Sequence, residues 1–275
     1  MKNYLSFTSI NVAKSPIFHG GNEKTGSSPI LRTIYIWTDQ GEVPIPYIHG
    51  NAVRGKARRT LIKDFLYRVS FKIKNKKLYH SLYSGGVLES TDSSVGIIDL
   101  TLRKKIVELI PAISLFGAGF GNQLIQGKLV VGHMWPLCKE YAPYLPKNID
   151  DIRIEKPVRI FTDSSFITRR DDLREERAED EQAVQMKVDY ECFIPGTAFW
   201  HEFKLMWPND IEKACFAHMI DLWKENPIIG GRSSSGDGEL QLNYELPFDS
   251  SAYLQFVEEN KEAIVLFLEA LDEGL

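Results

Sequence analysis

The stretch PIPYIHGNAVRGKARR, residues 44–59, decides the prediction of the fold, because an extended segment ends in it and a cationic helix begins. The prolines at 44 and 46 favour an edge strand or an irregular extended stretch. Asn51 follows a glycine and is predicted to cap the helix. An apolar stripe recurs every four residues and predicts an amphipathic helix over 51–69, with Val53, Ala57, Leu61, Phe65 and Val69 facing the core.

The polar side of this predicted helix is strongly cationic. Residues 54–77 contain ten lysines and arginines and one acid, although the formal net charge of the chain is -4. An acidic protein that concentrates its cations in one segment is expected to present that segment to a polyanion. Arg54 and Arg58 lie one turn apart, so we expect them to contact nucleic-acid phosphates beside the N–H groups of the helix start. The alternative is an ordinary solvated helix face.

The order of the elements predicts an α+β fold. It matches an elaborated split βαβ (ferredoxin-like) core in a single domain over 1–275. Residues 70–100 are expected to be irregular, with a short helix at 100–110. The remaining predicted elements are strands or extended segments at 3–12, 30–37, 125–137, 157–162, 184–194, 194–207 and 240–246, and helices at 209–225 and 251–271.

Composition excludes several classes of protein. No apolar run reaches the length of a membrane span, and the start MKNYLSFTSI lacks the layout of a signal peptide, so we expect a cytoplasmic protein without a membrane partner. The three cysteines lie far apart and indicate neither disulfides nor a zinc site. The six histidines lack metal-ligand spacing, and no catalytic motif is present. We therefore predict no metal, no cofactor and no catalytic residue.

Two glycine-rich segments and one charged segment are candidates for binding. SLFGAGFGN (114–122) is predicted to be a loop. GGRSSSGDGEL (230–240) lacks the ending of a Walker A motif, yet its glycines, serines and Arg232 suit the approach of a phosphate backbone; a flexible turn is the alternative. Residues 169–181 carry four arginines and seven acids, which is typical of a salt-bridged exposed segment or of an arm packing on a neighbouring subunit.

Four segments together resemble the RAMP superfamily of CRISPR-associated proteins, most closely its Cas-seven class of backbone subunits. They are HGGNEKTGSSPILR (19–32), PYIHGNAVRGKARR (46–59), SLFGAGFGN (114–122) and GGRSSSGDGEL (230–240). The resemblance implies an RRM-like palm, a finger-like insertion at 70–112, a thumb-like hairpin at 163–188 and a C-terminal helix. It also implies that copies assemble along a guide RNA (crRNA), with other effector subunits, and present it to a target DNA or RNA strand.

The resemblance further implies a set of RNA-binding residues and a structural role. Type III subunits of this class cut target RNA with an aspartate in the loop that here reads GSSP, and Ser27 takes its place. Serine does not ionise near neutral pH, so a subunit that does not cleave its target is implied. TRRDD (168–172) and ECFIPGTAFWHEF (191–203) resemble the type IV version more than the type III one. The implied RNA-binding residues are Asn51, Arg54, Lys56, Arg58, Arg59, Phe116, Gly117, Arg169, Arg170, Gly230, Gly231, Arg232 and Ser233.

Three alternatives stay open at this point. The first is a type III-like target-RNA endoribonuclease that uses another acid, such as Asp39 or Asp99. The second is an endoribonuclease that matures the guide precursor, with His49 beside the basic helix as its candidate residue. The third is an α/β protein whose basic helix binds an acidic protein surface. His49 could either point at RNA or cap the strand end.

Overall fold

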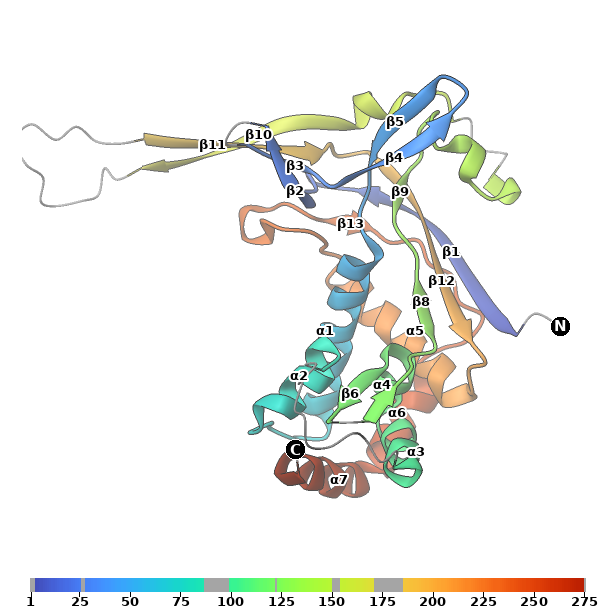
Figure 1. The fold of residues 1–275 in the computed structure, drawn as a ribbon. Coiled ribbons are helices and arrows are strands. Elements are labelled where there is room, and N and C mark those ends of the chain that lie inside the picture. The colour runs from blue at the N-terminus through green and yellow to red at the C-terminus, as the bar shows by residue number, and fades with distance from the viewer. Residues whose placement is uncertain are drawn as a thin grey trace, which may run out of the picture.

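The main sheet of the protein is antiparallel and has the strand order β13-β1-β12-β8, with β9 also pairing with β12 (Figure 1). The computed structural model describes residues 3–25, 28–86, 99–121, 123–149, 154–170 and 185–274. Helices and antiparallel strands together confirm the predicted α+β class. The strands of this sheet are β1 (Tyr4–Ala13), β8 (Leu129–Val131), β9 (Trp135–Pro136), β12 (Ala198–Met206) and β13 (Leu240–Gln241).

The core lies between this sheet and two helices, α1 (Gly50–Arg68) and α5 (Asp210–Glu225). Every second residue of β12 is buried, as a strand with one covered face requires. Phe203 pairs in register with Phe7 of β1, and both rings contact Phe216 of α5, with centroids 5.4 and 5.2 Å away. The apolar alternation of these strands and the helical stripe of α1 are therefore satisfied by one common core.

A series of hydrogen-bonded polar groups crosses the core beside these rings. The Nε2 atom of His201 lies 3.1 Å from the carbonyl oxygen of Gly132, and its Nδ1 atom lies 2.8 Å from the hydroxyl of Tyr244. That hydroxyl also accepts a hydrogen bond from the Asn11 side-chain amide at 3.1 Å. His201 therefore donates from Nε2 and accepts at Nδ1, which is the arrangement of a neutral imidazole.

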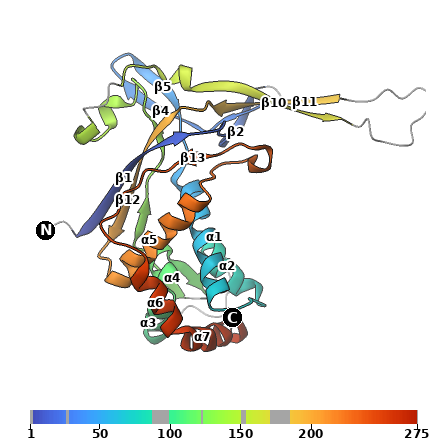
Figure 2. The same cartoon turned by 180° about the vertical axis from the view of Figure 1, so that it is seen from behind.

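Paired strands surround the core. The β10 (Thr162–Arg170) and β11 (Gln185–Phe193) hairpin projects from the body in both views (Figures 1 and 2). The strand predicted at 157–162 is wrong, because Val158–Phe161 forms a 3-10 turn before β10. The other pairs are β2 (Gly20–Thr25) with β3 (Ser28–Leu31), β4 (Thr33–Thr38) with β5 (Gly41–Pro46), and β6 (Ala118–Phe120) with β7 (Gln123–Ile125).

Several helices differ from the prediction. Asn75 caps a helix inside the segment expected to be irregular, and a proline at the first position starts another helix before the expected glycine loop. The final helix is two helices, which meet at Asn260 (Figure 2). The helices besides α1 and α5 are α2 (Lys76–Ser84), α3 (Leu100–Leu109), α4 (Pro111–Phe116), α6 (Ser251–Glu259) and α7 (Lys261–Gly274).

Two of the expected strands are shorter than predicted. Residues 125–137 contribute the end of β7 and the separate strands β8 and β9, because the run is interrupted around Gly127 and Gly132. Of 240–246, only Leu240–Gln241 pairs with β1. All three cysteines are free and buried. No helix in the described ranges is both long enough and apolar enough to span a bilayer.

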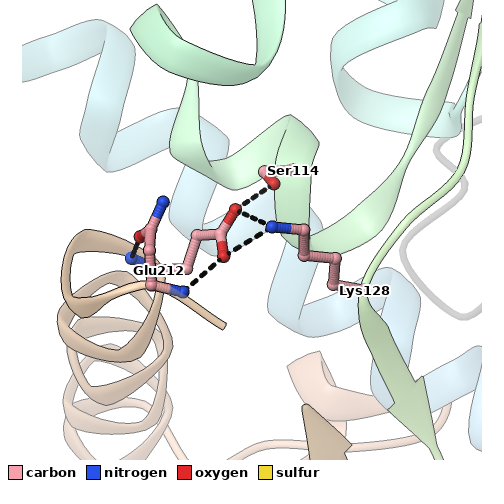
Figure 3. A network of polar contacts seen from close by, with 4 residues as sticks. Ser114, Lys128 and Glu212 are labelled. Carbon is pink, nitrogen blue, oxygen red and sulfur yellow. Dashed lines mark hydrogen bonds and ion pairs between the residues drawn. The ribbon is translucent and has the colours of Figure 1, made fainter. Parts of the chain in front are cut away.

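A buried carboxylate joins α5 to α4 and to the start of β8. Glu212 is 2 % exposed, and it accepts hydrogen bonds from the Ser114 hydroxyl and from the Lys128 ammonium, whose Nζ lies 2.7 and 2.9 Å from the two carboxylate oxygens (Figure 3). Its Oε2 atom also accepts from the Asn209 N–H at 2.9 Å, which completes a capping box for α5. Every contact of this carboxylate comes from a donor, so only an acceptor suits the site.

Replacing Glu212 with glutamine is expected to lower the free energy of unfolding by about 2 kcal/mol. The amide nitrogen of the new side chain would face N–H or ammonium donors, and a buried donor would lose its partner. Urea unfolding measures the change. Asp210→Asn is the matched control, because that acid lies in the same helical turn and its side chain is 91 % exposed. Equal effects of the two substitutions would contradict a special role of the Glu212 network.

Candidate nucleic-acid interface

The start of α1 is held by three histidine rings. The backbone N–H of Asn51 donates to Nδ1 of His49 at 3.0 Å, so His49 is the capping residue and the predicted cap at Asn51 is wrong. The N–H of His49 donates to Nε2 of His19 at 3.1 Å, and that of Gly50 to Nδ1 of His133 at 2.9 Å. The N–H groups expected to attract phosphate therefore already have imidazole partners.

Gly50 is required at this start because α1 approaches β8 very closely. A Cβ atom at Gly50 would lie 2.6 Å from the carbonyl oxygens of Val131 and Gly132, closer than side-chain atoms approach backbone oxygen. The glycine thus fixes the position of α1 against the sheet. The glycine of the sequence HGN, at which the extended segment gives way to the helix, is therefore needed for the contact between α1 and β8.

The guanidinium groups of Arg54 and Arg58, which were predicted to contact phosphates, donate to backbone carbonyls of the protein itself. Arg58 is 6 % exposed and donates from Nε to the Leu82 carbonyl at 2.7 Å and from Nη2 to the carbonyls of Ser81 and Gly117 at 3.1 and 2.5 Å. Arg54 donates to the carbonyls of Leu129 and Phe116. Burial, together with the charge of Arg54, lowers the pKa of Arg58 to about 10, so it stays charged at neutral pH.

These two arginines hold the α4–β6 turn in place. The ring of Phe116 lies under both guanidinium groups. Its centroid lies 5.5 Å from the guanidinium carbon of Arg54 and 5.7 Å from that of Arg58. Phe116 is 2 % exposed, and Gly117 is buried at a φ of +67°, where a Cβ would lie 2.5 Å from backbone atoms. Phe116 and Gly117, which were predicted to line an RNA surface, are therefore buried against α1.

The open face of α1 borders a cleft of about 660 Å³. Lys56 and Arg59 line it from α1, and the loop after α5 lines it with Gly230, Gly231 and Ser233. The third wall is the segment Phe18–Gly21, which comes from the glycine-rich sequence before β3. Five predicted RNA-binding residues thus meet in one place. The residues at 18–21 were absent from the predicted set, although the glycine pair in HGGNEK was their sequence signal.

Close backbone contacts hold the loop wall of the cleft in position. The N–H of Gly231 donates to the Phe18 carbonyl at 2.9 Å. Gly230 adopts a φ of +83°, and a Cβ there would lie 2.4 Å from the same carbonyl oxygen. The loop is consequently held against the neighbouring segment, which favours a fixed edge of the cleft over the alternative of a flexible turn.

Arg232 packs beside the cleft between two aromatic rings. Its guanidinium carbon lies 3.9 Å from the centroid of Tyr190 in β11 and 5.1 Å from that of Phe18. The Tyr190 hydroxyl donates to a carboxylate oxygen of buried Asp237 at 2.7 Å. Arg232 therefore connects the base of the β10–β11 hairpin to the glycine loop. The next residue, Ser233, lines the cleft, whereas Arg232 does not.

The electrostatic character of the cleft is cationic. Arg59 is exposed, and burial together with the nearby Arg59 charge lowers the pKa of Lys56. Burial and the charges of Arg32 and His49 lower the pKa of His19 to about 4, so His19 is neutral at physiological pH. Among the described residues that line the cleft, none carries a carboxylate. The site suits an anion whose charges are spread along a chain.

Three other predicted residues lie apart from the cleft, and part of the predicted hairpin lies outside the described residues. Asn51 is exposed on the first turn of α1, and Arg169 and Arg170 lie at the far end of β10, in register with Met186 and Gln185. Ser27 and residues 171–184 of the predicted thumb-like hairpin lie outside the described residues.

The residues considered for catalysis have structural positions. His49 and Asp99 both cap helices, Asp99 by accepting from the Leu102 N–H at 2.9 Å, and Asp39 lies in the turn between β4 and β5. No set of three or more histidine, cysteine, aspartate or glutamate side chains is grouped for metal binding within the described ranges.

The comparisons with known proteins give a match in structure only. No protein-family model and no curated protein matches this chain. Among solved structures, a chain of the structure described as "Type IV-B CRISPR Complex" superimposes with a TM-score of 0.65 and 17 % sequence identity. The match covers 91 % of this chain and 98 % of that one, so the two share their fold over nearly their whole lengths.

Proposed function

We propose that this chain is a structural RNA-binding backbone subunit of a type IV CRISPR effector ribonucleoprotein, within the Cas-seven class of the RAMP superfamily. The observation that carries the proposal is the cationic cleft in which Lys56 and Arg59 of α1 meet two glycine-rich segments. A main chain exposed at glycines, with two cations and no carboxylate among the described lining residues, suits a ribose-phosphate backbone. The shared fold with a chain of a type IV-B CRISPR complex supports the same assignment.

The proposal includes an RRM-like palm. The strand order of the sheet, β13-β1-β12-β8, supports it, because this is the order found in a split βαβ core. In the sequence, α1 follows β1 and precedes β8, and α5 follows β12 and precedes β13, as that core requires. In this proposal the cleft grips guide RNA at the edge of the palm. Specificity for the target then comes from base pairing by the guide, while the protein holds its backbone.

The β10–β11 hairpin is the proposed thumb, and residues 70–112 are the proposed finger-like insertion. The hairpin projects away from the sheet (Figure 1), so it can reach another copy on the same guide. Arg169 and Arg170 at its far end are proposed to contact the RNA there. The serine at position 27 supports a subunit that holds the target without cutting it.

The double variant Lys56→Glu with Arg59→Glu tests the cleft. Its affinity for single-stranded RNA is expected to fall at least about tenfold at low salt, because two cations become anions beside the phosphate path. Fluorescence anisotropy measures the affinity, and circular dichroism checks that the fold is kept. The double variant Lys104→Glu with Lys105→Glu is the control, since both lysines are exposed on α3 and the change in net charge is identical. Unchanged RNA affinity of the cleft variant would refute the proposed function.

A further inference from the structure

The cationic surface continues from the cleft along one face of α1. Ala52, Lys56, Arg59, Lys63 and Tyr67 are spaced by three or four residues, so they follow one another on a single side of the helix. Ala52, Lys56 and Arg59 line the cleft, whereas Lys63 and Tyr67 lie beyond it and are exposed. From Lys56 to Tyr67 the helix rises about 16 Å, a distance that the cleft itself does not cover.

The segment after α1 also displays cations. Its residues alternate, since Phe71 and Ile73 pack against the core while Lys72 and Lys74 are exposed. The Asp272 carboxylate of α7 accepts from the backbone N–H of Lys74 at 3.0 Å, which fixes the segment and leaves the ammonium groups outward. The alternation therefore displays cations on a rigid support.

The surface combines unpaired charge with one exposed aromatic ring. Within the described residues, no carboxylate lies at ion-pair distance from Lys63, Lys72, Lys74 or Lys76. The neighbouring acid, Asp64, pairs with Arg68 and His218 instead. Tyr67 is 83 % exposed at the end of this helix face. Cations that track a backbone beside an aromatic ring are the usual features of a surface for single-stranded nucleic acid.

We infer that a nucleic-acid strand bound in the cleft continues along α1, with its phosphates on Lys63, Lys72, Lys74 and Lys76 and a base stacked on Tyr67. These five residues form the distal track. The inference rests on the proposed function, because it assigns the course of the same strand beyond the cleft. The occupant is a phosphodiester chain, since only a partner with regularly repeated negative charge matches this many unpaired ammonium groups.

The variant Lys63→Gln with Lys72→Gln tests the distal track. Affinity is measured for oligoribonucleotides of increasing length over a range of salt concentrations. In the wild-type protein, affinity is expected to keep rising after the oligonucleotide fills the cleft. In the variant it should stop rising at a shorter length, and the slope of log affinity against log salt should become shallower by about 1.4, or about 0.7 for each lost phosphate contact.

Two comparisons separate the possible outcomes. Lys104→Gln with Lys105→Gln on α3 removes the same charge from another surface and is expected to leave the length dependence and the salt slope unchanged. Tyr67→Ala should weaken only the longer oligonucleotides, without changing the salt slope. If the distal variant binds every length like wild type while the Lys56/Arg59 variant fails, the distal track is refuted and the cleft stands. If the distal variant instead loses only a protein partner, a phosphodiester occupant is refuted as well.

Discussion

Replacing Arg58 with methionine is expected to lower the free energy of unfolding by about 3 kcal/mol, although the same change at Arg59 is expected to alter it by less than about 0.5 kcal/mol. The neighbouring arginines differ in their partners. Arg58 donates three hydrogen bonds to carbonyls of α2 and of the α4–β6 turn, whereas Arg59 is exposed beside the cleft. Methionine fills much of the same volume but leaves those carbonyl oxygens without donors.

The size of the effect follows from two opposing contributions. Each carbonyl that loses its partner in a buried place costs about 1–3 kcal/mol. Removing a buried charge recovers part of this cost, because the guanidinium no longer has to be desolvated. Arg58 links the segments of Leu82 and Gly117 to α1 through its guanidinium, so loosening of these segments is expected as well.

Urea unfolding, followed by tryptophan fluorescence, measures the stability of both variants. A binding titration at low salt measures their affinity for RNA. Arg58→Met should shift the unfolding midpoint, while Arg59→Met should keep the midpoint and weaken RNA binding. If both variants unfolded like wild type and both lost RNA, Arg58 would belong to the binding surface and the assignment made from its buried contacts would be wrong. The pair therefore tests the fold and the proposed site together.

This pair of arginines also shows what the sequence could predict and what it could not. The four-residue apolar spacing predicted α1 and its core face, and the lysines and arginines of the segment predicted its cationic character. Both are local properties of 51–69. The partners of Arg54 and Arg58 are backbone carbonyls that lie 23 to 75 residues away in the sequence. Every residue carries a carbonyl, so no pattern of side chains predicts which one an arginine will contact. For this reason the sequence assigned phosphate binding to the arginines that face inward as readily as to Lys56 and Arg59.

The same distinction applies to the remaining elements. Long periodic segments such as β1 and α5 were predicted to within about one residue of their ends, because one continuous face meets the core. Short strands such as β8 and β13 depend on which partner lies beside them, so glycines near their ends obscured their limits. The cleft needed tertiary structure for a similar reason, since the segment 18–21 reaches Gly230 and Gly231 only in the folded chain.

Acidification from pH 7 to pH 5 is expected to lower the free energy of unfolding by roughly 3 kcal/mol, because several histidines are held neutral in the folded protein. Burial lowers the pKa of His201 to about 3, and burial together with the charges of Arg32 and His49 lowers that of His19 to about 4. Burial also lowers the pKa of His49 and of His133. In each ring an acceptor nitrogen takes a hydrogen bond, and protonation would remove that acceptor.

The sign follows from the protons that each state binds. The unfolded chain takes up these protons near pH 6.5, whereas the folded protein does not until the pH approaches the lowered pKa values. Stability is therefore complete above pH 6.5 and declines as the pH falls below it. A fully buried histidine such as His201 contributes about 2 kcal/mol of this loss by pH 5, and the partly exposed rings contribute less. The lowered pKa of Asp64, where hydrogen bonds from His218 and Arg68 outweigh the opposing effect of burial, acts only at lower pH.

The variant His49→Asn separates the histidine effect from general acid denaturation. Asparagine can accept the Asn51 N–H as a helix cap and does not titrate, so stability at pH 7.5 should change little. Its stability should fall less steeply than that of wild type between pH 6.5 and pH 5, because one fewer ring is protonated on unfolding. Urea unfolding at a series of pH values, with proton uptake measured on unfolding, gives both slopes. Parallel curves for the two proteins would show that the ring capping α1 carries none of the pH dependence, and the cap would then have to tolerate a protonated imidazole.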